Sequence, residues 1–383
     1  MKICYITTYS STDRRNWSGT ADAIRKSIEM QGADVVCLGP LHTHVPRLLR
    51  FQNRVRRFFE HGRVELERYP EVSRGYASQI QDRLPVDTDV ILSPGSLAIA
   101  QLETRTPVVI YSDATFSSFL DHYGQRSQYS PSCIRAGEAL ERAAYKRASL
   151  IVFASTWAAQ SAITDYGVAE RKVRVIPFGA NLYNAPDSGQ VKNQIRSRSR
   201  TECHLLSIGT DWQRKGMDRS VQLVSKLRLL GIDAKLTIVG SQPAPDTILP
   251  DFVRCMDFID KTTDDGERQL SHLFSEAHFH VLLSRAEAYG IVFAEASAHG
   301  TPNIAYDVGG ISTAVKHGRN GYLFAQHENE STIAQRVAET FLNTDKYNAL
   351  CFSSRREFEN CLNWTVAGQS LMSEIRQIHH STT

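Results

Sequence analysis

Residues 278–324 read HFHVLLSRAEAYGIVFAEASAHGTPNIAYDVGGISTAVKHGRNGYLF. The apolar run His278–Leu283 predicts a buried strand, and a polar loop follows it. A helix of small residues is expected over Gly290–His299, because a glycine and then a proline come after it. The next strand is predicted at Asn303–Tyr306, and Gly309–Gly310 opens another helix. This alternation of strands and helices is typical of a parallel sheet covered by helices.

Two glutamates flank the start of the first of these helices. Glu287 lies in the loop, and Glu295 lies about a turn and a half into the helix. The first amides of a helix, here those of Gly290, Ile291 and Val292, lack internal acceptors and carry partial positive charge, so they suit a phosphate. A carboxylate farther along the same helix can accept hydrogen bonds from a diol such as a ribose. Spacing alone is equally consistent with an ordinary loop acid and an ordinary helix acid.

The surrounding motifs decide between these interpretations. The Glu-x7-Glu pair, the strand before it, the Glu-Ala-x-Ala helix, the Gly-x-Pro stop and the later Gly-Gly and Asn-Gly together resemble the retaining family 4 glycosyltransferases. The resemblance implies the α/β architecture called GT-B, in which two Rossmann-like domains face a central cleft. It also implies that the second domain binds the sugar donor and the first domain binds the acceptor.

Composition sets the broad class of the protein. The 383 residues are 42% hydrophobic and 22% charged, which fits a globular protein of two domains. The formal net charge of +3 is too small to indicate nucleic-acid binding. Seven scattered cysteines without a C-x-x-C pair favour free thiols in a reducing compartment over a disulfide framework or a zinc site. With no cleavable signal and no apolar run near the ~18 residues of a membrane span, we expect a cytoplasmic protein.

The chain is predicted to divide into four parts. Residues 1–183 would form an acceptor-binding Rossmann-like domain, and residues 201–362 a nucleotide-sugar-binding one. Residues 184–200, rich in Ser, Gln, Asn and Arg without an apolar period, are interpreted as a linker. Residues 363–383 have helical spacing and are expected to fold back on the first domain.

The first domain opens with a strand, a glycine-containing loop and a helix. The strand Lys2–Thr8 runs into the polar loop Ser10–Ser18, and Gly19 lies where the helix Thr20–Gln31 begins. The resembling family often has two adjacent glycines in this loop, facing the diphosphate or the acceptor. Only Gly19 is present here, and a lone glycine is more often just a turn.

Asp113 follows the predicted strand Val108–Asp113 in the loop SDATF. The carboxyl ends of strands are where open α/β sheets bind ligands. The resembling family often has a histidine near the end of this strand, close to the donor sugar, and this chain has Asp113 instead. A capping aspartate is an equally good interpretation.

Asp87-Thr88-Asp89 has the Asp-x-Asp spacing of the metal site in the other large glycosyltransferase fold. There the acids follow a buried strand. Here they precede the strand Val90–Ser93, in a turn after Pro85. We interpret them as turn residues and expect no metal site.

The segment Arg47–Arg63 interleaves six arginines with leucine, valine and phenylalanine, and Glu60 is its only acid. Basic and apolar residues at helical spacing can lie on an anionic membrane surface. The alternative, which the sequence favours slightly, is a surface helix whose apolar stripe faces its own core. Nucleic acid is a third partner, but nothing else in the chain supports it.

The second domain restarts with the strand Leu205–Gly209, followed by a polar loop and the amphipathic helix Met217–Leu230. Arg214 and Lys215, in this loop, are well placed to bind a diphosphate. The resembling family keeps a Lys-Gly here, matched by Lys215 and Gly216. The family commonly has an arginine directly after the glycine that ends this strand. Here Arg214, farther along the loop, would supply that positive charge.

The predicted reaction moves a sugar from a nucleotide diphosphate sugar to a hydroxyl of a glycan, a glycolipid or a small molecule, with retention and without a metal or a cofactor. By the resemblance, the catalytic residues are Arg214, Lys215, Glu287 and Asp113. The donor would be bound by Gly19, Arg214, Lys215, Glu287, Tyr289, Gly290, Ile291, Val292 and Glu295. The alternatives are an epimerase, hydrolase or phosphorylase on the same fold, or a non-catalytic binding subunit. A dinucleotide-dependent oxidoreductase is disfavoured, because no G-x-G-x-x-G follows the first strand.

Overall fold

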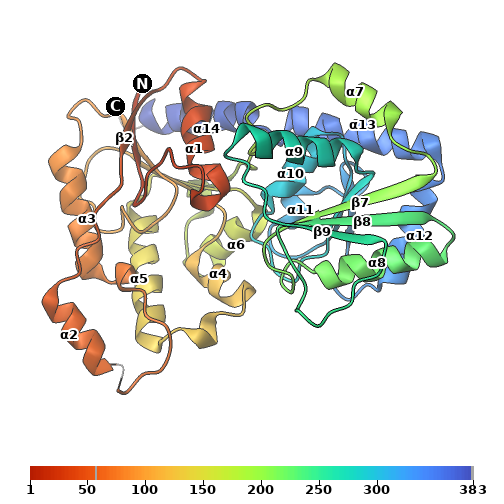
Figure 1. Cartoon of the computed structure of the whole chain (residues 1–383). Helices are drawn as coiled ribbons and strands as arrows, with labels where there is room; N and C mark the ends of the chain where they lie inside the picture. The colour runs from red at the N-terminus through yellow and green to blue at the C-terminus, as the bar shows by residue number, and fades with distance from the viewer. Residues whose placement is uncertain (57, 381–383) are drawn as a thin grey trace. The chain divides into compact units, whose positions relative to one another are not determined.

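The structure is a computed structural model that describes residues 1–56 and 58–380 (Figure 1). The chain forms two compact units. Unit 1 contains Met1–Pro177 and the C-terminal residues from Ala367, and unit 2 is Phe178–Val366. Each unit has its own six-stranded parallel sheet, as expected for two Rossmann-like domains. The central cleft expected from the sequence stays a prediction.

The sheet of unit 1 follows the order β2-β1-β3-β4-β5-β6, and all pairings are parallel. Its strands are β1 (Lys2–Ile6), β2 (Asp34–Leu38), β3 (Val90–Ser93), β4 (Val108–Ser112), β5 (Leu150–Phe153) and β6 (Val173–Val175). Strands β3 and β5 are buried along their whole length, which explains their continuous apolar runs. The strand order reverses between β1 and β3, and ligands bind at the carboxyl ends beside such a point.

Unit 1 has a core that includes Ile6, Ile91, Ile110 and Ile151 from neighbouring strands, and its helices surround the sheet. They are α1 (Thr20–Glu29), α2 (Arg47–Arg56), α3 (Pro70–Arg83), α4 (Phe116–His122), α5 (Pro131–Arg147), α6 (Thr156–Thr164) and most of α14 (Trp364–His380).

The C-terminal helix α14 folds back on the first domain, as the sequence predicted. Gly368 lies so close to α1 that a Cβ there would be 2.4 Å from the carbonyl oxygen of Ser27. Arg174 Nε also donates to Glu374 Oε2 over 2.9 Å. A glycine at position 368 therefore permits the close packing of α14 against α1.

The sheet of unit 2 has the order β12-β11-β10-β7-β8-β9, the doubly wound order of dinucleotide-binding folds. Its strands are β7 (Glu202–Ile208), β8 (Asp233–Val239), β9 (Val253–Met256), β10 (Phe279–Leu282), β11 (Asn303–Tyr306) and β12 (Gly321–Phe324). Its helices are α7 (Ser188–Ser197), α8 (Met217–Leu229), α9 (Asp264–Glu276), α10 (Ile291–Ala298), α11 (Ile311–Ala314), α12 (Glu330–Phe341) and α13 (Thr344–Asn360). The order reverses between β7 and β10, so the loops after these two strands lie together.

The prediction that residues 184–200 form a linker is wrong, because most of this segment is helix α7. Asp187 and Gln190 form a capping box at its start, and Val191 and Ile195 are buried. Two buried side chains four residues apart are enough to fix one face of a helix. The polar composition of the segment hid this short stripe.

Unit 2 begins at Phe178, ahead of the boundary expected after residue 183, and the last strand of unit 1, β6, ends at Val175. The ring of Phe178 lies edge-on to Tyr289 with centroids 5.3 Å apart and 5.5 Å from the ring of Trp364. These aromatic contacts join the start of unit 2 to its own interior.

All seven cysteines carry free thiols, as the sequence predicted. Cys4, Cys133, Cys203 and Cys351 are buried, and burial raises the pKa of the Cys4 thiol to about 12. Among the residues that the structure describes, no helix has the length and apolar character needed to cross a membrane.

Candidate functional site

In unit 2 the loops after β7 and β10 meet beside the point where the strand order reverses. The amide of Arg285 donates to the carbonyl of Arg214 over 2.7 Å and ties the two loops together. Gly216 has a φ of +67°, and a Cβ there would be 2.0 Å from the carbonyl oxygen of Leu283. Only glycine allows this close approach. The glycine of the Lys-Gly pair is therefore a structural requirement of this junction.

This junction brings the predicted charged residues together. Lys215 Nζ forms an ion pair with Glu287 Oε2, and Arg214 Nη1 lies 3.6 Å from the same oxygen. The side chains of Lys215 and Glu287 are only 13% and 11% exposed. Arg214 is also held by Asp211, whose Oδ2 is 3.3 Å from its Nε. Two cations thus converge on one carboxylate at the carboxyl edge of the sheet.

Helix α10 begins beside this cluster. Gly290 is its N-cap with a φ of +80°, and a Cβ there would be 2.5 Å from the ring of Phe293. The amides of Ile291 and Val292 follow in the first turn, where helical N–H groups lack acceptors within the helix. The predicted phosphate-binding amides therefore start the helix that leaves the loop containing Glu287.

Glu295 lies on the same helix and is 5% exposed. Its Oε1 accepts a hydrogen bond from Lys261 Nζ over 2.7 Å. No described residue donates to its Oε2, and this oxygen is not among the buried atoms that lack a partner. One oxygen of the carboxylate is thus paired and the other remains accessible to water.

Tyr289, the remaining predicted donor-binding residue of this loop, has a structural partner. Its hydroxyl donates to the carbonyl of Phe178 over 2.8 Å, and the residue is 2% exposed. Burial raises the pKa of Tyr289 well above its ordinary value, so the hydroxyl remains a donor. Its contact with a donor stays a prediction.

Asp113 and the loop of Gly19 lie together in unit 1. Trp17 Nε1 donates to Asp113 Oδ2 over 3.1 Å, which connects the loop after β1 to the loop after β4. Trp17 and Ser18 have φ angles of +48° and +55°, and Gly19, the N-cap of α1, has +87°. Two consecutive non-glycine residues in the left-handed region are strained, and such strain clusters at functional sites.

The loop around Asp113 also affects Tyr9. Burial, together with the nearby negative charge of Asp113, raises the pKa of Tyr9 to about 12. The phenol is therefore neutral at any physiological pH and can act as a hydrogen-bond donor.

Asp87 and Asp89 lie at the amino end of β3, away from the carboxyl ends of the strands. Lys2 Nζ is 2.5 Å from Asp87 Oδ2, and the amide of Lys2 donates to Asp89 Oδ2 over 2.7 Å. Both acids thus have partners in β1. Among the described residues, no group of three or more His, Cys, Asp or Glu side chains is arranged to hold a metal ion.

A surface pocket of about 670 Å³ lies between α4 and α6 of unit 1. The rings of His122 and Trp157 contact each other in it, with centroids 4.9 Å apart. The other lining residues are polar: Ser118, Asp121, Thr156, Gln160, Ser161, Thr164 and Asp165. An aromatic surface among hydroxyl, amide and carboxylate groups can bind a sugar ring.

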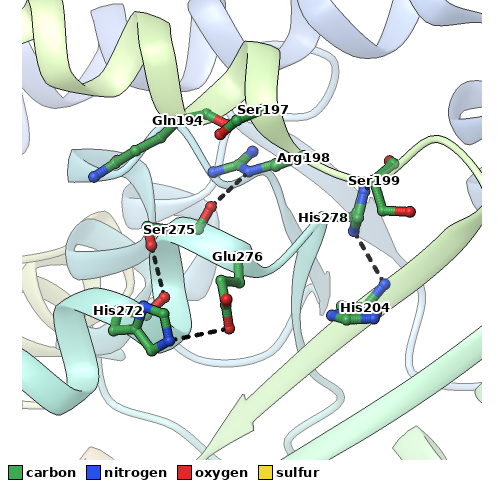
Figure 2. Close-up of a pocket in the computed structure, with 9 residues that line it drawn as sticks. All are labelled: Gln194, Ser197, Arg198, Ser199, His204, His272, Ser275, Glu276 and His278. Carbon is green, nitrogen blue, oxygen red and sulfur yellow. Dashed lines mark hydrogen bonds and ion pairs between the residues drawn. The ribbon is translucent and has the colours of Figure 1, made fainter.

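A second pocket, of about 340 Å³, lies in unit 2 near the amino-terminal ends of β7 and β10 (Figure 2). Its wall includes His204 and His278, next to the amino ends of β7 and β10, and Arg198, whose Nε donates to the carbonyl of Ser275 over 3.0 Å. The amino ends are remote from the carboxyl ends of the strands, so the pocket does not belong to the charged cluster.

The structure adds residues that the sequence reasoning did not assign. Lys261 pairs with Glu295, Asp211 with Arg214, and Trp17 with Asp113. Lys261 lies in the segment after β9, and its position in the sequence did not indicate a contact with Glu295. Nothing in the sequence indicates the contact that Trp17 makes with a loop 96 residues away.

Two family models match the chain. Residues 20–183 match the model described as Glycosyltransferase Family 4, and residues 192–355 match the one described as Glycosyl transferases group 1. Together these matches cover most of both units. The chain belongs to the family 4 glycosyltransferases.

Curated relatives are similar over part of their length. The chain is 31% identical over 176 residues to the D-inositol 3-phosphate glycosyltransferase of Paenarthrobacter aurescens, which covers 44% of this chain and 43% of that protein. It is 25% identical over 241 residues to the mannosylfructose-phosphate synthase of Agrobacterium fabrum, covering 60% of this chain and 53% of that protein. The chain spans about half the length of these relatives.

Solved structures share the fold across the whole chain. Sucrose-phosphate synthase from Thermosynechococcus elongatus aligns with a TM-score of 0.68 and 16% identity, covering 100% of both chains. Anabaena HepE, crystallised in complex with UDP-glucose, aligns with a TM-score of 0.62 and 18% identity, covering 98% of this chain and 100% of that one. The fold is therefore the two-domain, Rossmann-like GT-B fold.

Proposed function

We propose that this protein transfers a sugar from a nucleotide diphosphate sugar to an acceptor hydroxyl, with retention at the anomeric carbon and without a metal. One observation carries the proposal. Lys215 and Arg214 converge on Glu287 beside the first turn of α10, at the carboxyl edge of the sheet in unit 2. A site that combines two cations, helix amides and a carboxylate suits a diphosphate joined to a sugar.

Each group of the cluster has a proposed role. Arg214, Lys215 and the amides of Gly290, Ile291 and Val292 would neutralise the diphosphate as it leaves. Such preorganised charge is usually the largest contribution to catalysis.

The two glutamates would bind the hydroxyl groups of the donor. Glu287 would accept hydrogen bonds from the sugar or stabilise positive charge that develops on its ring. The accessible Oε2 of Glu295 would accept from the ribose while Oε1 keeps its contact with Lys261.

Retention follows if the acceptor oxygen attacks from the face that the diphosphate leaves. The bond between the anomeric carbon and the diphosphate oxygen breaks, and the bond to the acceptor oxygen forms. The acceptor's proton passes to the departing diphosphate oxygen, so no protein nucleophile is required. The resemblance to the retaining family 4 enzymes supports this stereochemistry.

UDP-glucose, the ligand named for Anabaena HepE, is the first donor to test. The acceptor, which we expect to be a glycan, a lipid-linked molecule or a small molecule, would bind unit 1. Asp113 and the pocket that contains Trp157 are the candidate contacts. We propose a cytoplasmic reaction, because the seven free thiols suit a reducing compartment.

A thermal-shift screen against UDP, GDP, ADP and TDP sugars tests the donor site. A ligand at 100 times its Kd should stabilise the protein by about 2.7 kcal/mol. The same ligand should give a much smaller shift with Lys215→Met, whereas Lys226→Met, which changes a lysine on the far turn of α8, should respond like the parent. No shift with any nucleotide sugar would contradict the proposal.

Acceptor dependence separates the alternatives on the same fold. A transferase releases nucleoside diphosphate in quantity only when an acceptor is added, whereas a hydrolase releases it in water alone. An epimerase releases none and converts one nucleotide sugar into another. A binding subunit would show the thermal shift without any turnover.

A further inference from the structure

The outward face of α2 and of the turn after it carries large apolar side chains. We call Leu48, Phe51, Val55, Phe58 and Phe59 the α2 apolar stripe. They are 67%, 63%, 41%, 80% and 82% exposed, respectively. An amphipathic surface helix normally turns its apolar stripe toward the core. Here the stripe faces solvent, so the interpretation that it packs in the core is wrong.

The inward face of α2 is occupied by other residues. Leu49 is 2% exposed and Asn53 is 8% exposed. At 100° per residue, these two lie on the side of the helix opposite Phe51 and Val55. The orientation of α2 is therefore set by its own buried contacts, which leave the α2 apolar stripe outside.

Arginines border the stripe on the same outward side. Arg47, Arg50 and Arg54 are exposed and fall along one line at spacings of three and four residues. In the part of the chain that the structure describes, none of the three forms an ion pair. Arg56 is half-buried over the ring of Tyr69, and Arg57 lies outside the described residues.

The turn after α2 is tied to the body of unit 1. Glu60 Oε2 accepts from the amide of Ser132 over 2.9 Å, and the amide of Arg63 donates to the carbonyl of Gln128 over 2.6 Å. These bonds anchor the residues that follow Phe58 and Phe59 in the sequence. The two rings therefore project from a turn that is fixed at its end.

Charge is concentrated in this segment. Residues 47–63 contain six arginines and one acid, whereas the whole chain has a formal net charge of +3. The segment is therefore more positive than the whole protein, and the remainder is net negative. A partner that binds here must tolerate both strong positive charge and protruding phenyl rings.

We propose that α2 and the turn after it dock unit 1 on an anionic lipid surface. The α2 apolar stripe would enter the boundary between headgroups and acyl chains, and Arg47, Arg50 and Arg54 would bind the anionic headgroups beside it. A convex helix with two projecting phenylalanines needs no matching groove on a lipid surface, as it would on a folded protein. The proposal goes beyond sugar transfer and does not depend on it.

Sedimentation with vesicles tests the docking without donor or acceptor. The full chain should pellet with vesicles of phosphatidylcholine and phosphatidylglycerol at low salt, and binding should fall at high salt. Replacing Arg47, Arg50 and Arg54 by glutamine should weaken binding on the order of 100-fold, since each basic residue near an anionic surface contributes to binding. Changing Phe58 and Phe59 to serine should weaken it roughly tenfold or more.

A matched control removes the same charge elsewhere in unit 1. Arg105, Arg171 and Arg376 are exposed, and changing them to glutamine should leave vesicle binding within about twofold of the parent. Circular dichroism should show that all variants fold, because the changed side chains are exposed.

Three outcomes would overturn the proposal. The protein could stay in the supernatant with anionic vesicles at low salt, or the control variant could lose binding as much as the α2 variant. Light scattering could also show a dimer that the Phe58→Ser and Phe59→Ser changes dissociate, in which case a second copy covers the stripe. The nucleotide-sugar thermal shift would be unaffected by any of these results.

Discussion

Lys261 Nζ lies 2.7 Å from Glu295 Oε1, so the buried carboxylate of α10 has a charged partner on one oxygen and water access on the other. This pair joins the segment after β9 to the helix that starts beside Lys215 and Glu287. A ribose that binds Oε2 would meet a carboxylate already oriented by the lysine.

We predict that Glu295→Ala loses a charge-assisted contact of roughly 1.5–3 kcal/mol, which is about ten- to a hundredfold in affinity for the nucleotide. Calorimetric titration with the nucleoside diphosphate found by the screen measures this. Glu339→Ala, on an exposed face of α12, is the control and should bind like the parent. Unchanged nucleotide binding by Glu295→Ala would rule out the ribose role.

Turnover is predicted to survive EDTA. The diphosphate is assigned to Arg214, Lys215 and a helix terminus of unit 2, whereas Asp87 and Asp89 belong to unit 1 and are paired with Lys2 at the amino ends of its strands. The double change of Asp87 and Asp89 to asparagine should therefore leave the rate within a few-fold of the parent. If chelation abolishes turnover and Mn²⁺ or Mg²⁺ restores it, the proposed set of diphosphate ligands is incomplete.

Unit 2 is predicted to lose stability in mild acid. Burial lowers the pKa of His278 and of His280 to about 4, and that of His299 to about 3. Because the unfolded value is about 6.5, the folded state excludes protons that the unfolded chain binds. The stabilisation is complete above pH 6.5 and is lost as the pH falls toward 4.

Each of these histidines should contribute about 1.4 kcal/mol per pH unit between about pH 6.5 and 4.5. Urea unfolding at several pH values gives the slope of the unfolding free energy against pH. In His278→Asn this slope should be smaller by the contribution of one proton. His272→Asn, at an exposed position, is the control and should keep the parental slope. Equal slopes in the parent and His278→Asn would show that the buried histidine is not excluded from protonation.

Arg198 is predicted to be essential for the stability of unit 2. Its guanidinium is buried and donates to the carbonyls of Ser275, His299 and Gly300 over 3.0–3.1 Å, at the carboxyl ends of α9 and α10. These ends carry partial negative charge, which a buried cation offsets.

Removing the guanidinium leaves several buried carbonyl groups without donors, so Arg198→Ala should cost roughly 3–5 kcal/mol of unfolding free energy. Arg198→Lys keeps the charge but offers fewer directed donors, so its unfolding free energy should lie between those of the parent and Arg198→Ala. Arg200→Ala, at an exposed position two residues away, should change stability by less than about 0.5 kcal/mol. A small effect of Arg198→Ala in urea unfolding would contradict this account.

The regular elements were predictable where hydrophobic burial dominates. The apolar runs at Val90–Ser93 and Asn303–Tyr306 match β3 and β11 at both ends. Helix α7 was missed, because Val191 and Ile195 are its only buried side chains and the polar residues around them mask the period. Arg198 falls within the expected linker, but its side chain is buried, and the residue is 5% exposed.

The charged cluster was predictable for a different reason. Arg214, Lys215 and Glu287 each follow a predicted strand, and loops at the carboxyl ends of adjacent parallel strands lie together. The pairing of Lys261 with Glu295 depends on the position of the segment after β9, which periodicity does not give. Periodicity also cannot tell which side of an arginine-rich helix faces the core, so the exposure of the α2 apolar stripe required the structure.

The return of α14 to unit 1 has a consequence for how the protein is made. Unit 2 is one continuous stretch, Phe178–Val366, whereas unit 1 needs residues from both sides of it. A ribosome therefore completes unit 2 first, although it starts unit 1 first. Until Gly368 and Glu374 emerge from the ribosome, the surface of α1 near Ser27 and the side chain of Arg174 stay uncovered. The packing of unit 1 is therefore completed only after helix α14 has been synthesised.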